Sequence, residues 1–384
     1  MPRKACISGV YDTAVGVLTG SSCMGLHAEA ARGAAADAGV AFDDIDGVLC
    51  GYSLTEPHMM LSSVLCEYAG LHPTFTSAIQ VGGATGAIMV MHAAALVESG
   101  HCRHVLCVGG DNRVSALSSA GAVTAVASVG HPQFEYPFGM SVPAAYALVA
   151  QRYMHEFGAT PEHLAAIAVT TREHALRHPN AHMKDRITMD DVANSRIISS
   201  PLRLLDCCLI SDGAAGILIS AADAAADTKA PIEILGSGQG HTHEHIFAAP
   251  SLTHFGCSDS APRAFVEAGV EPKDIDVAEI YDSFTITLLI ELESMGFFEK
   301  GEAGEAALNG ALDLGGALPC NTHGGLLSYG AAGAAGGMFH ITEGVRQLRG
   351  EADTRQVEGA QLALVHGDGG ILSAHGTMIL GSNR

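Results

Sequence analysis

The amino-acid sequence predicts an α/β protein built from two copies of one structural unit. Residues 37–46 (DAGVAFDDID) match residues 267–276 (EAGVEPKDID), and each segment follows an alanine-rich helical run and leads into a β-like segment. Residues 85–100 resemble residues 335–350, because both begin with small residues, run as a helix and end in glycine, as helix C-termini do. The two matches occur in the same order along the chain, so we infer a duplication.

Apolar strands follow the second matching helix in both copies, at residues 104–111 and 361–370. Strands that alternate with helices predict mostly parallel sheets. We divide the chain into an N-terminal half (1–111 and 207–228), an inserted loop domain (112–206) and a C-terminal half (229–384). The insertion combines helical pieces with a polar stretch, and we expect it to shape a substrate pocket.

Composition excludes several classes of protein. Apolar residues make up 48% of the 384 residues, which excludes an intrinsically disordered chain. The 20 Lys and Arg against 41 Asp and Glu give a net charge of −21, which repels phosphate backbones and argues against nucleic-acid binding. We expect no membrane span and no signal peptide, because the long apolar runs that they require are missing. The ten cysteines form no C-x-x-C pair, so we expect no zinc ribbon in this chain and a cytoplasmic location.

Two short patterns suggest ligand sites that we do not expect. GSGQG at 236–240 is similar to a dinucleotide turn, but HTHEHIF follows it in place of a helix. His241, His243 and His245 alternate and could share one face of a strand, but a solvated or pocket-lining loop is the better interpretation. We therefore predict neither a nicotinamide cofactor nor a metal site.

Several motifs distributed over nearly the whole chain resemble the thiolase superfamily, specifically its sterol-carrier-protein or lipid-transfer-protein type. This resemblance implies the thiolase fold, with duplicated βαβαβ halves in a five-layered α-β-α-β-α arrangement and an inserted loop domain. The motifs are IQVGGATGAIMV (79–90), YMHEFGATPEHLA (153–165), PLRLLDCCLISDGAAG (201–216), AEIYDSFTITLLIELESMGFF (278–298), NTHGGLLSYGAAGAAGG (321–337) and ALVHGDGG (363–370).

The chain departs from the thiolase pattern at all four chemical positions. Gly83 stands where the family has its nucleophilic Cys, and Ala331 stands where a His activates that Cys. The third motif, Asn-Glu-Ala-Phe or His-Asp-x-Phe in the family, begins with Tyr281 here, and the segment from His366 to Gly370 lacks the second Cys. Without a thiol nucleophile, Claisen chemistry through an acyl-enzyme is lost. The missing side chain should leave free space beside Gly83.

The resemblance still implies a binding site for a thioester carbonyl. The turn at residues 82–86 presents backbone N–H groups at a helix start, and in the family fold the glycine-rich turn at 367–370 faces it. We expect Gly83, Gly369 and Gly370 to form an oxyanion site that holds the carbonyl as it becomes an enolate.

Side chains in the altered motifs are the candidates for proton transfer. We predict Tyr281 and Tyr329 as the acid/base pair, although a tyrosine at a strand end more often packs with its hydroxyl hydrogen-bonded. Asp282 could orient Tyr281 or a water molecule, or be a structural acceptor. His366 could be an acid/base or an oxyanion donor, and His323 is a further candidate.

The chemistry that remains without a thiol is aldol or retro-aldol. The arrangement is similar to that of the thiolase-like aldolases that shorten steroid side chains, so we predict retro-aldol cleavage of a β-hydroxyacyl-CoA. One alternative is an acyl-CoA C-acetyltransferase or thiolase that uses another residue, with Cys23 and Cys320 as the thiols nearest to the motifs. The other alternative is a non-catalytic acyl-CoA or lipid-binding subunit.

The resemblance also implies partners. It predicts a homodimer flanked by two copies of an OB-fold/zinc-ribbon protein, a heterotetramer in which the partner completes the CoA site. The small number of basic residues favours such help with the CoA phosphates. We expect no cofactor other than the CoA thioester substrate.

Overall fold

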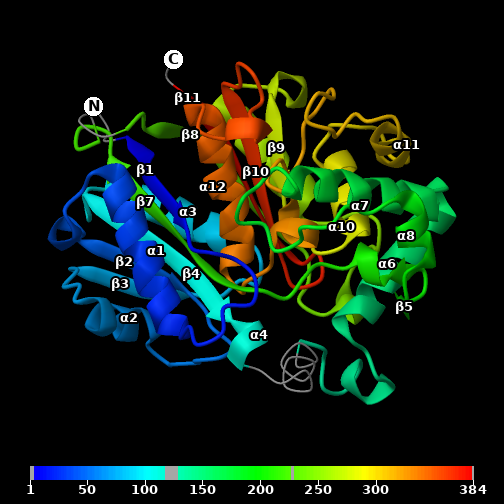
Figure 1. The fold of residues 1–384 in the computed structure, drawn as a ribbon, viewed down its shortest axis with the longest axis horizontal. Coiled ribbons are helices and arrows are strands. Elements are labelled where there is room, and N and C mark those ends of the chain that lie inside the picture. The colour runs from blue at the N-terminus through cyan, green and yellow to red at the C-terminus, as the bar shows by residue number, and fades with distance from the viewer. Residues whose placement is uncertain (1–3, 117–128, 226–228, 383–384) are drawn as a thin grey trace.

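One mixed β-sheet organises the computed structural model, which describes residues 4–116, 129–225 and 229–382 (Figure 1). Among these residues, nine strands form a sheet in the order β3-β2-β4-β7-β1-β8-β11-β10-β9. The N-terminal half contributes β1 (Ala5–Asp12), β2 (Gly47–Gly51), β3 (Phe75–Ile79), β4 (His104–Asn112) and β7 (Asp212–Ala221). The C-terminal half contributes β8 (Ile232–His241), β9 (Val277–Ile280), β10 (Leu362–Gly369) and β11 (Ala374–Ser382).

The strand order confirms the duplication. Outward from the junction, the N-terminal half runs β1-β7-β4-β2-β3 and the C-terminal half runs β8-β11-β10-β9. A parallel bridge between Ala278 and Cys320 takes the place of the fifth strand in the second half. The halves join through β1 and β8, where Cys6 pairs with Glu233 and Ile7 with Ile232.

The sheet is mixed, so the prediction of mostly parallel strands is wrong. Only β3-β2, β2-β4 and β10-β9 are parallel among the strands of the large sheet, and the other neighbours are antiparallel. The physical reason is that β7 and β11 return as antiparallel partners of β4 and β10. Their apolar sequences do not reveal the direction in which they pair.

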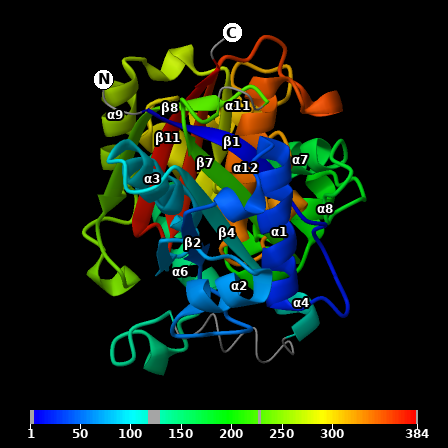
Figure 2. The same cartoon turned by 90° about the vertical axis from the view of Figure 1, so that its left-hand side faces the viewer.

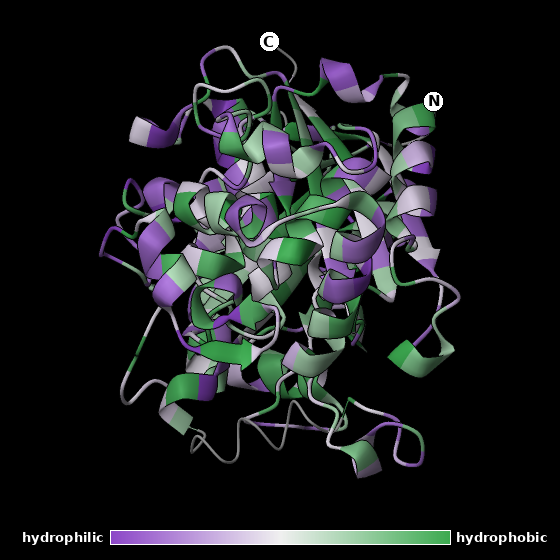
Figure 3. Ribbon diagram, turned by 90° about the vertical axis from the view of Figure 1, so that its right-hand side faces the viewer, coloured by the Kyte–Doolittle hydropathy of each residue, from purple (hydrophilic) through white to green (hydrophobic). Residues whose placement is uncertain are grey.

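Two buried helices fill the layer between the half-sheets. These are α3 (Thr85–Glu98) and α12 (Ala335–Arg349), which contact each other and strands of both halves (Figure 1). Figure 2 shows α1 (Cys23–Ala38) and α2 (Leu61–Ala69) on the outer side of the N-terminal half. Helices α9 (Cys257–Ala268) and α10 (Thr285–Ser294) pack in the C-terminal half. This arrangement is the five-layered α-β-α-β-α fold. Figure 3 shows apolar strands in its interior and hydrophilic residues on the outer helices and loops.

The insertion packs mainly against the C-terminal half. Helix α7 contacts α10 and α11 and the short helix η6, which carries Tyr329 (Figure 1). The division of the chain into 1–111 and 207–228, 112–206 and 229–384 stays a prediction, and residues 1–3, 117–128, 226–228 and 383–384 lie outside the described part. The remaining elements within the described residues are α4 (Arg113–Ala116), α6 (Val142–Phe157), α7 (Pro161–Ala175), α8 (Met189–Asn194), α11 (Ala303–Leu308), β5 (Ile197–Ser199), β6 (Leu202–Arg203), η1 (Phe42–Asp44), η2 (Tyr136–Phe138), η3 (Leu204–Asp206), η4 (Ile246–Ala248), η5 (Pro272–Asp274), η6 (Gly325–Tyr329) and η7 (Asp353–Arg355).

Within the described ranges, no helix is both long and apolar enough to span a membrane.

The crossing of α3 and α12 depends on Gly86. A methyl group on Gly86 would lie 2.7 Å from Cγ of Met338 and 3.1 Å from its backbone nitrogen. We predict that Gly86→Ala lowers the free energy of unfolding by about 1–3 kcal/mol, the usual cost of overpacking, although alanine favours helices. Denaturant unfolding measures the change. Met338→Ala should relieve part of the loss in the double variant, and strict additivity would contradict this origin of the strain.

Candidate active site

Two glycine-rich turns meet at the N-terminus of α3. Gly82 and Gly83 precede the helix, Gly369 is the last residue of β10, and Gly370 follows it in the turn. A methyl group on Gly82 would lie 2.7 Å from the backbone nitrogen of Gly370 and 2.8 Å from Cα of Gly369. Such distances leave no room for a side chain, and the φ of 54° at Gly82 also favours glycine. The expectation that the turns face each other is confirmed, whereas the oxyanion role of Gly83, Gly369 and Gly370 stays a prediction.

The phenol of Tyr281 occupies the space beside Gly83. A Cβ atom built on Gly83 would overlap Cζ and the hydroxyl oxygen of Tyr281, and also the backbone oxygen of Asp368. The expectation of free space at this position is therefore wrong. The structure instead places a phenol where the side chain of residue 83 would project.

Strand β9 and helix α12 together position Tyr281. The residue directly follows β9, and its backbone N–H donates to the carbonyl oxygen of His366 at 3.1 Å. Its half-buried ring lies over the start of α12, where methyl groups on Gly336 and Gly337 would approach it to 3.8 and 3.6 Å. Burial raises the pKa of Tyr281 well above its usual value, and Tyr52 adds to this effect. Tyr281 is therefore a neutral phenol near pH 7.

Tyr329 lies in a buried polar network at the end of η6. Its hydroxyl donates to Oδ2 of Asp12 at 3.3 Å, and the same oxygen accepts from Thr342 at 3.0 Å and pairs with Arg346. Burial raises the pKa of Tyr329 well above its usual value, and Asp12 raises it further. The acid/base role of Tyr329 stays a prediction, since this hydroxyl already has a protein partner.

Asp282 anchors the helix that carries Tyr329. Its Oδ1 accepts a hydrogen bond from the backbone N–H of Leu326 at 2.6 Å. A side chain on Gly325 would overlap the carboxylate, so the carboxylate packs directly against backbone. Burial raises the pKa of Asp282 to about 7, although backbone hydrogen bonds oppose the rise. Asp282 thus accepts hydrogen bonds from backbone in this structure, and the choice between its two roles stays a prediction.

The structure does not bring the side chain of His366 to the glycine turns. The neighbouring Gly367 faces α3, where a methyl group would lie 3.0 Å from Cα of Ala84. Because side chains alternate along a strand, His366 points to the other face of the sheet. There its Nδ1 bonds Oγ1 of Thr377 at 2.8 Å, and its Nε2 lies 3.1 Å from Nδ1 of His375. Burial lowers the pKa of His366 to about 3.

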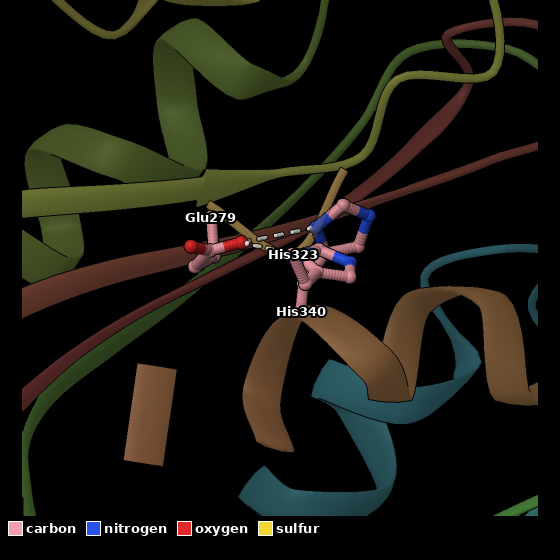
Figure 4. Close-up of side chains that lie close together, drawn as sticks. All are labelled: Glu279, His323 and His340. Atoms are coloured by element: carbon pink, nitrogen blue, oxygen red, sulfur yellow. Dashed lines mark ion pairs between the residues drawn. The ribbon is translucent and has the colours of Figure 1, made fainter. Parts of the chain in front are cut away.

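His323 belongs to a buried group beneath Tyr281, which we call the lower cluster (Glu279, His323 and His340; Figure 4). Nδ1 of His323 lies 2.9 Å from Oε2 of Glu279, and Nδ1 of His340 lies 3.7 Å from the same oxygen. Burial opposes the charge on Glu279, but His323 holds the pKa of this carboxyl at about 2. Burial likewise opposes the charge on His323, but Glu279 raises its pKa. His323 thus pairs with Glu279 in this structure, and its acid/base role stays a prediction.

None of the ten cysteines is an activated thiol. Burial raises the pKa of every one of them. The pKa of Cys23 rises to about 12, and Cys320 is fully buried next to Glu279 and Asp282, which raise its pKa further. Nucleophilic cysteines instead have a depressed pKa.

The structure gathers side chains that the sequence analysis missed. Two sets of three buried residues lie close enough to share an ion in the described part of the chain, although we expected no metal site. Their members lie 9–84 positions apart and in different elements, so no ligand spacing could reveal them, and His241, His243 and His245 belong to neither set. The residues missed are Glu279 and His340 of one set, and Glu291 and His375 of the other, in which His366 is the third member.

Comparison with protein families decides the classification. The family described as "Thiolase, N-terminal domain" matches residues 7–223, and "Thiolase C-terminal domain-like" matches residues 238–382. The chain belongs to the thiolase family. The relatives of this thiolase-family protein include sterol carrier protein 2 of Gallus gallus, 29% identical over 89% of the chain and 64% of the relative.

Relatives of similar length include both a lyase and an acetyltransferase. The 17-hydroxy-3-oxo-4-pregnene-20-carboxyl-CoA lyase of Mycobacterium tuberculosis is 36% identical over 96% of this chain and 97% of its own. The acetyl-CoA acetyltransferase of Methanothermobacter thermautotrophicus is 34% identical over 97% and 99%. Among solved structures, the Ltp2-ChsH2(DUF35) aldolase superposes with a TM-score of 0.88 at 32% identity, covering 99% of this chain and 98% of that one.

Because His366 is buried, we predict that the free energy of unfolding of the thiolase-family protein falls in acid. An unfolded histidine takes up a proton near pH 6.5, whereas folded His366 resists protonation down to about pH 3. Stability from this group is complete above pH 6.5 and is lost as the pH falls toward 3. Between pH 7 and 5 we expect a loss of about 2 kcal/mol from His366.

Denaturant unfolding at both pH values measures this loss. The His366→Gln variant should lose about 2 kcal/mol less than the wild type over the same interval. The exposed His58 provides the control, since His58→Gln should keep the wild-type dependence on pH. Equal losses in His366→Gln and the wild type would contradict the prediction.

Proposed function

We propose that this protein cleaves a β-hydroxyacyl-CoA by a retro-aldol reaction. The observation that carries the proposal is the position of the Tyr281 phenol. It fills the space that a side chain on residue 83 would occupy. A thiol there would attack a thioester, whereas a neutral phenol is a proton donor and acceptor. The site therefore suits proton transfer beside a bound thioester.

Each step of the proposed reaction is assigned to a group of the site. A base removes the proton of the β-hydroxyl group, the C–O bond becomes a carbonyl, and the electron pair of the Cα–Cβ bond passes into the thioester enolate. Backbone N–H groups at Gly83, Gly369 and Gly370 stabilise the negative oxygen, and each such donor contributes about 3 kcal/mol. An acid then protonates Cα, which releases a ketone or aldehyde and a shortened acyl-CoA. Tyr281 and Tyr329 are the proposed acid and base, in either order.

Relatives support this reaction and its substrate class. The relative from Mycobacterium tuberculosis is named as a lyase of a pregnene carboxyl-CoA. A "Steroid side-chain-cleaving aldolase" of Thermomonospora curvata is 33% identical over 100% of this chain and 99% of its own. We therefore propose a CoA thioester with a steroid-type side chain as the substrate, and no other organic cofactor.

Acyl transfer is the second candidate, because two acetyl-CoA acetyltransferases are 34% and 32% identical to this chain over nearly its whole length. The raised pKa values of all ten cysteines argue against it. Non-catalytic acyl-CoA or lipid binding remains the third candidate.

The quaternary structure is also part of the proposal. The neighbour at TM-score 0.88 is named as an aldolase of Ltp2 with a DUF35 protein, which supports a heteromeric complex here. We propose a cytoplasmic homodimer flanked by two OB-fold/zinc-ribbon partners. A chain with a net charge of −21 gains from a partner that helps to hold the CoA phosphates.

Replacement of the phenols tests the chemistry. We expect Tyr281→Phe and Tyr329→Phe each to lower turnover of a β-hydroxyacyl-CoA about 10²–10⁴-fold, the span of one general acid/base. Gly83→Ala should cause a comparable loss, because its Cβ must displace the ring of Tyr281. Tyr68→Phe, on the outer helix α2 with 58% of its side chain exposed, is the control and should keep full activity.

The same assays separate the three candidates. Wild-type rates in both Phe variants would refute the assignment of the tyrosines. A covalent acyl adduct on a cysteine, detected by mass spectrometry after incubation with acyl-CoA, would favour acyl transfer. Tight acyl-CoA binding without turnover in every partner combination would favour the non-catalytic subunit.

Co-expression tests the partner. Alone, the chain should bind acyl-CoA weakly and turn it over slowly, and an OB-fold/zinc-ribbon protein encoded nearby should restore both when co-expressed. Gel filtration and turnover of the isolated and mixed proteins measure this. Full turnover and micromolar CoA affinity without a second protein would show that the chain acts independently.

A further inference from the structure

The lower cluster lies one side-chain layer beneath Tyr281. Glu279 precedes Tyr281 by two residues on the same face of β9, and His340 lies on α12 just beyond the two glycines that contact the Tyr281 ring. The ring centroids of Tyr281 and His340 are 6.1 Å apart. His323 joins from the loop before η6, so three separate elements converge on one point (Figure 4).

Hydrogen bonds do not satisfy the polar atoms of this cluster. Oε2 of Glu279 and both ring nitrogens of His323 and of His340 are buried without a hydrogen-bond partner in the described part of the chain. The 2.9 Å contact between Glu279 and His323 is close, but it is not aligned as a hydrogen bond. Five unsatisfied buried atoms in three adjacent side chains are costly, and a bound ion would satisfy three of them, Oε2 of Glu279 and one ring nitrogen of each histidine.

The distances match those around a tetrahedral metal ion. Ligand atoms about 2.1 Å from such an ion lie about 3.4 Å from one another. The two measured separations to Oε2 of Glu279, 2.9 Å from Nδ1 of His323 and 3.7 Å from Nδ1 of His340, bracket this value. Two imidazoles and a carboxylate are a donor set that suits divalent transition metals such as Zn²⁺.

The groups behind the ligands have the pattern of an outer coordination shell. Oε1 of Glu279 accepts from the backbone N–H and the hydroxyl of Thr322, at 3.0 and 2.8 Å, which aims Oε2 at the histidines. Nε2 of His340 faces Oδ1 of Asp282 at 3.7 Å, leaving Nδ1 toward Glu279. Hydrogen bonds that hold a ligating carboxylate are typical of metal sites, whereas Asp282 lies near Nε2 of His340 without forming a hydrogen bond to it.

The second buried set, Glu291, His366 and His375, provides an internal contrast. Both ring nitrogens of His366 are hydrogen-bonded, to Thr377 and to His375. In this set, both carboxylate oxygens of Glu291 and Nε2 of His375 are buried without a hydrogen-bond partner within the described residues, three of its six polar atoms, whereas five of the six are unsatisfied in the lower cluster.

We propose that Glu279, His323 and His340 bind one divalent transition-metal ion. The ion ties β9, α12 and the loop before η6 together beneath Tyr281, and it enters as the chain folds, since the site is buried. This inference goes beyond the proposed function and does not depend on it.

Metal analysis of the full chain tests the proposal. The chain is purified alone and without a histidine tag, because the proposed partner carries a zinc ribbon of its own. Elemental mass spectrometry after growth in medium supplemented with Zn²⁺, Fe²⁺ and Mn²⁺ should find about one transition metal per chain. His323→Gln and His340→Gln should each lower this content at least tenfold, while His375→Gln, in the contrasting set, should leave it unchanged.

Three results would overturn the proposal. These are less than a tenth of a metal per wild-type chain after supplementation, unchanged content in His340→Gln, or loss of metal only in His375→Gln. If the variants fail to fold, X-ray absorption at the metal edge of the wild-type protein still decides. Two imidazole ligands with an oxygen ligand support the site, and a spectrum without imidazole refutes it.

Discussion

The close approach of backbone to backbone at the N-terminus of α3 governs the centre of this molecule. Gly82 touches the turn at Gly369 and Gly370, and Gly86 touches Met338 of α12, with no room for a Cβ atom at either contact. These contacts bring the helix start, the end of β10 and the strand that carries Tyr281 to one point. The half-sheets and the two central helices must therefore assemble together before the site exists.

The missing side chain at residue 83 has a second consequence. It admits the ring of Tyr281, and Gly337 of α12 packs against the backbone oxygen of Gly83, where a Cβ atom would have no room. One glycine thus both removes a nucleophile and makes room for a phenol. In the same region, Asp282 holds the backbone of η6 and Asp12 accepts a hydrogen bond from the hydroxyl of Tyr329.

Much of this arrangement was predictable from sequence. The remainder depends on how strands pair and how elements distant in sequence pack together. The duplication follows from repeated helix and strand patterns, whereas the five layers and the choice of Tyr281 came from the resemblance to the family's motifs. The direction of β7 and β11 was not predictable. The choice of face for His366 was not predictable either, because the next residue, Gly367, is equally close in sequence and faces the opposite side. Glu279 and His340 look like ordinary strand and helix residues until the two elements pack.

Fold and chemistry separate clearly in this family. Relatives of nearly equal identity are named acetyltransferase and lyase, and the human mitochondrial 3-ketoacyl-CoA thiolase shares the fold with a TM-score of 0.76 at only 15% identity. The frame that holds a thioester against backbone N–H groups does not specify the reaction. What specifies it is the group beside the carbonyl, and in this chain that group is a phenol whose proton burial helps to retain. With the glycine turns in the proposed role of enolate stabiliser and a proton donor in place of the nucleophile, such a site is suited to breaking a carbon–carbon bond next to a hydroxyl group. The requirement for a β-hydroxyacyl thioester thus follows from the side chain that Gly83 lacks.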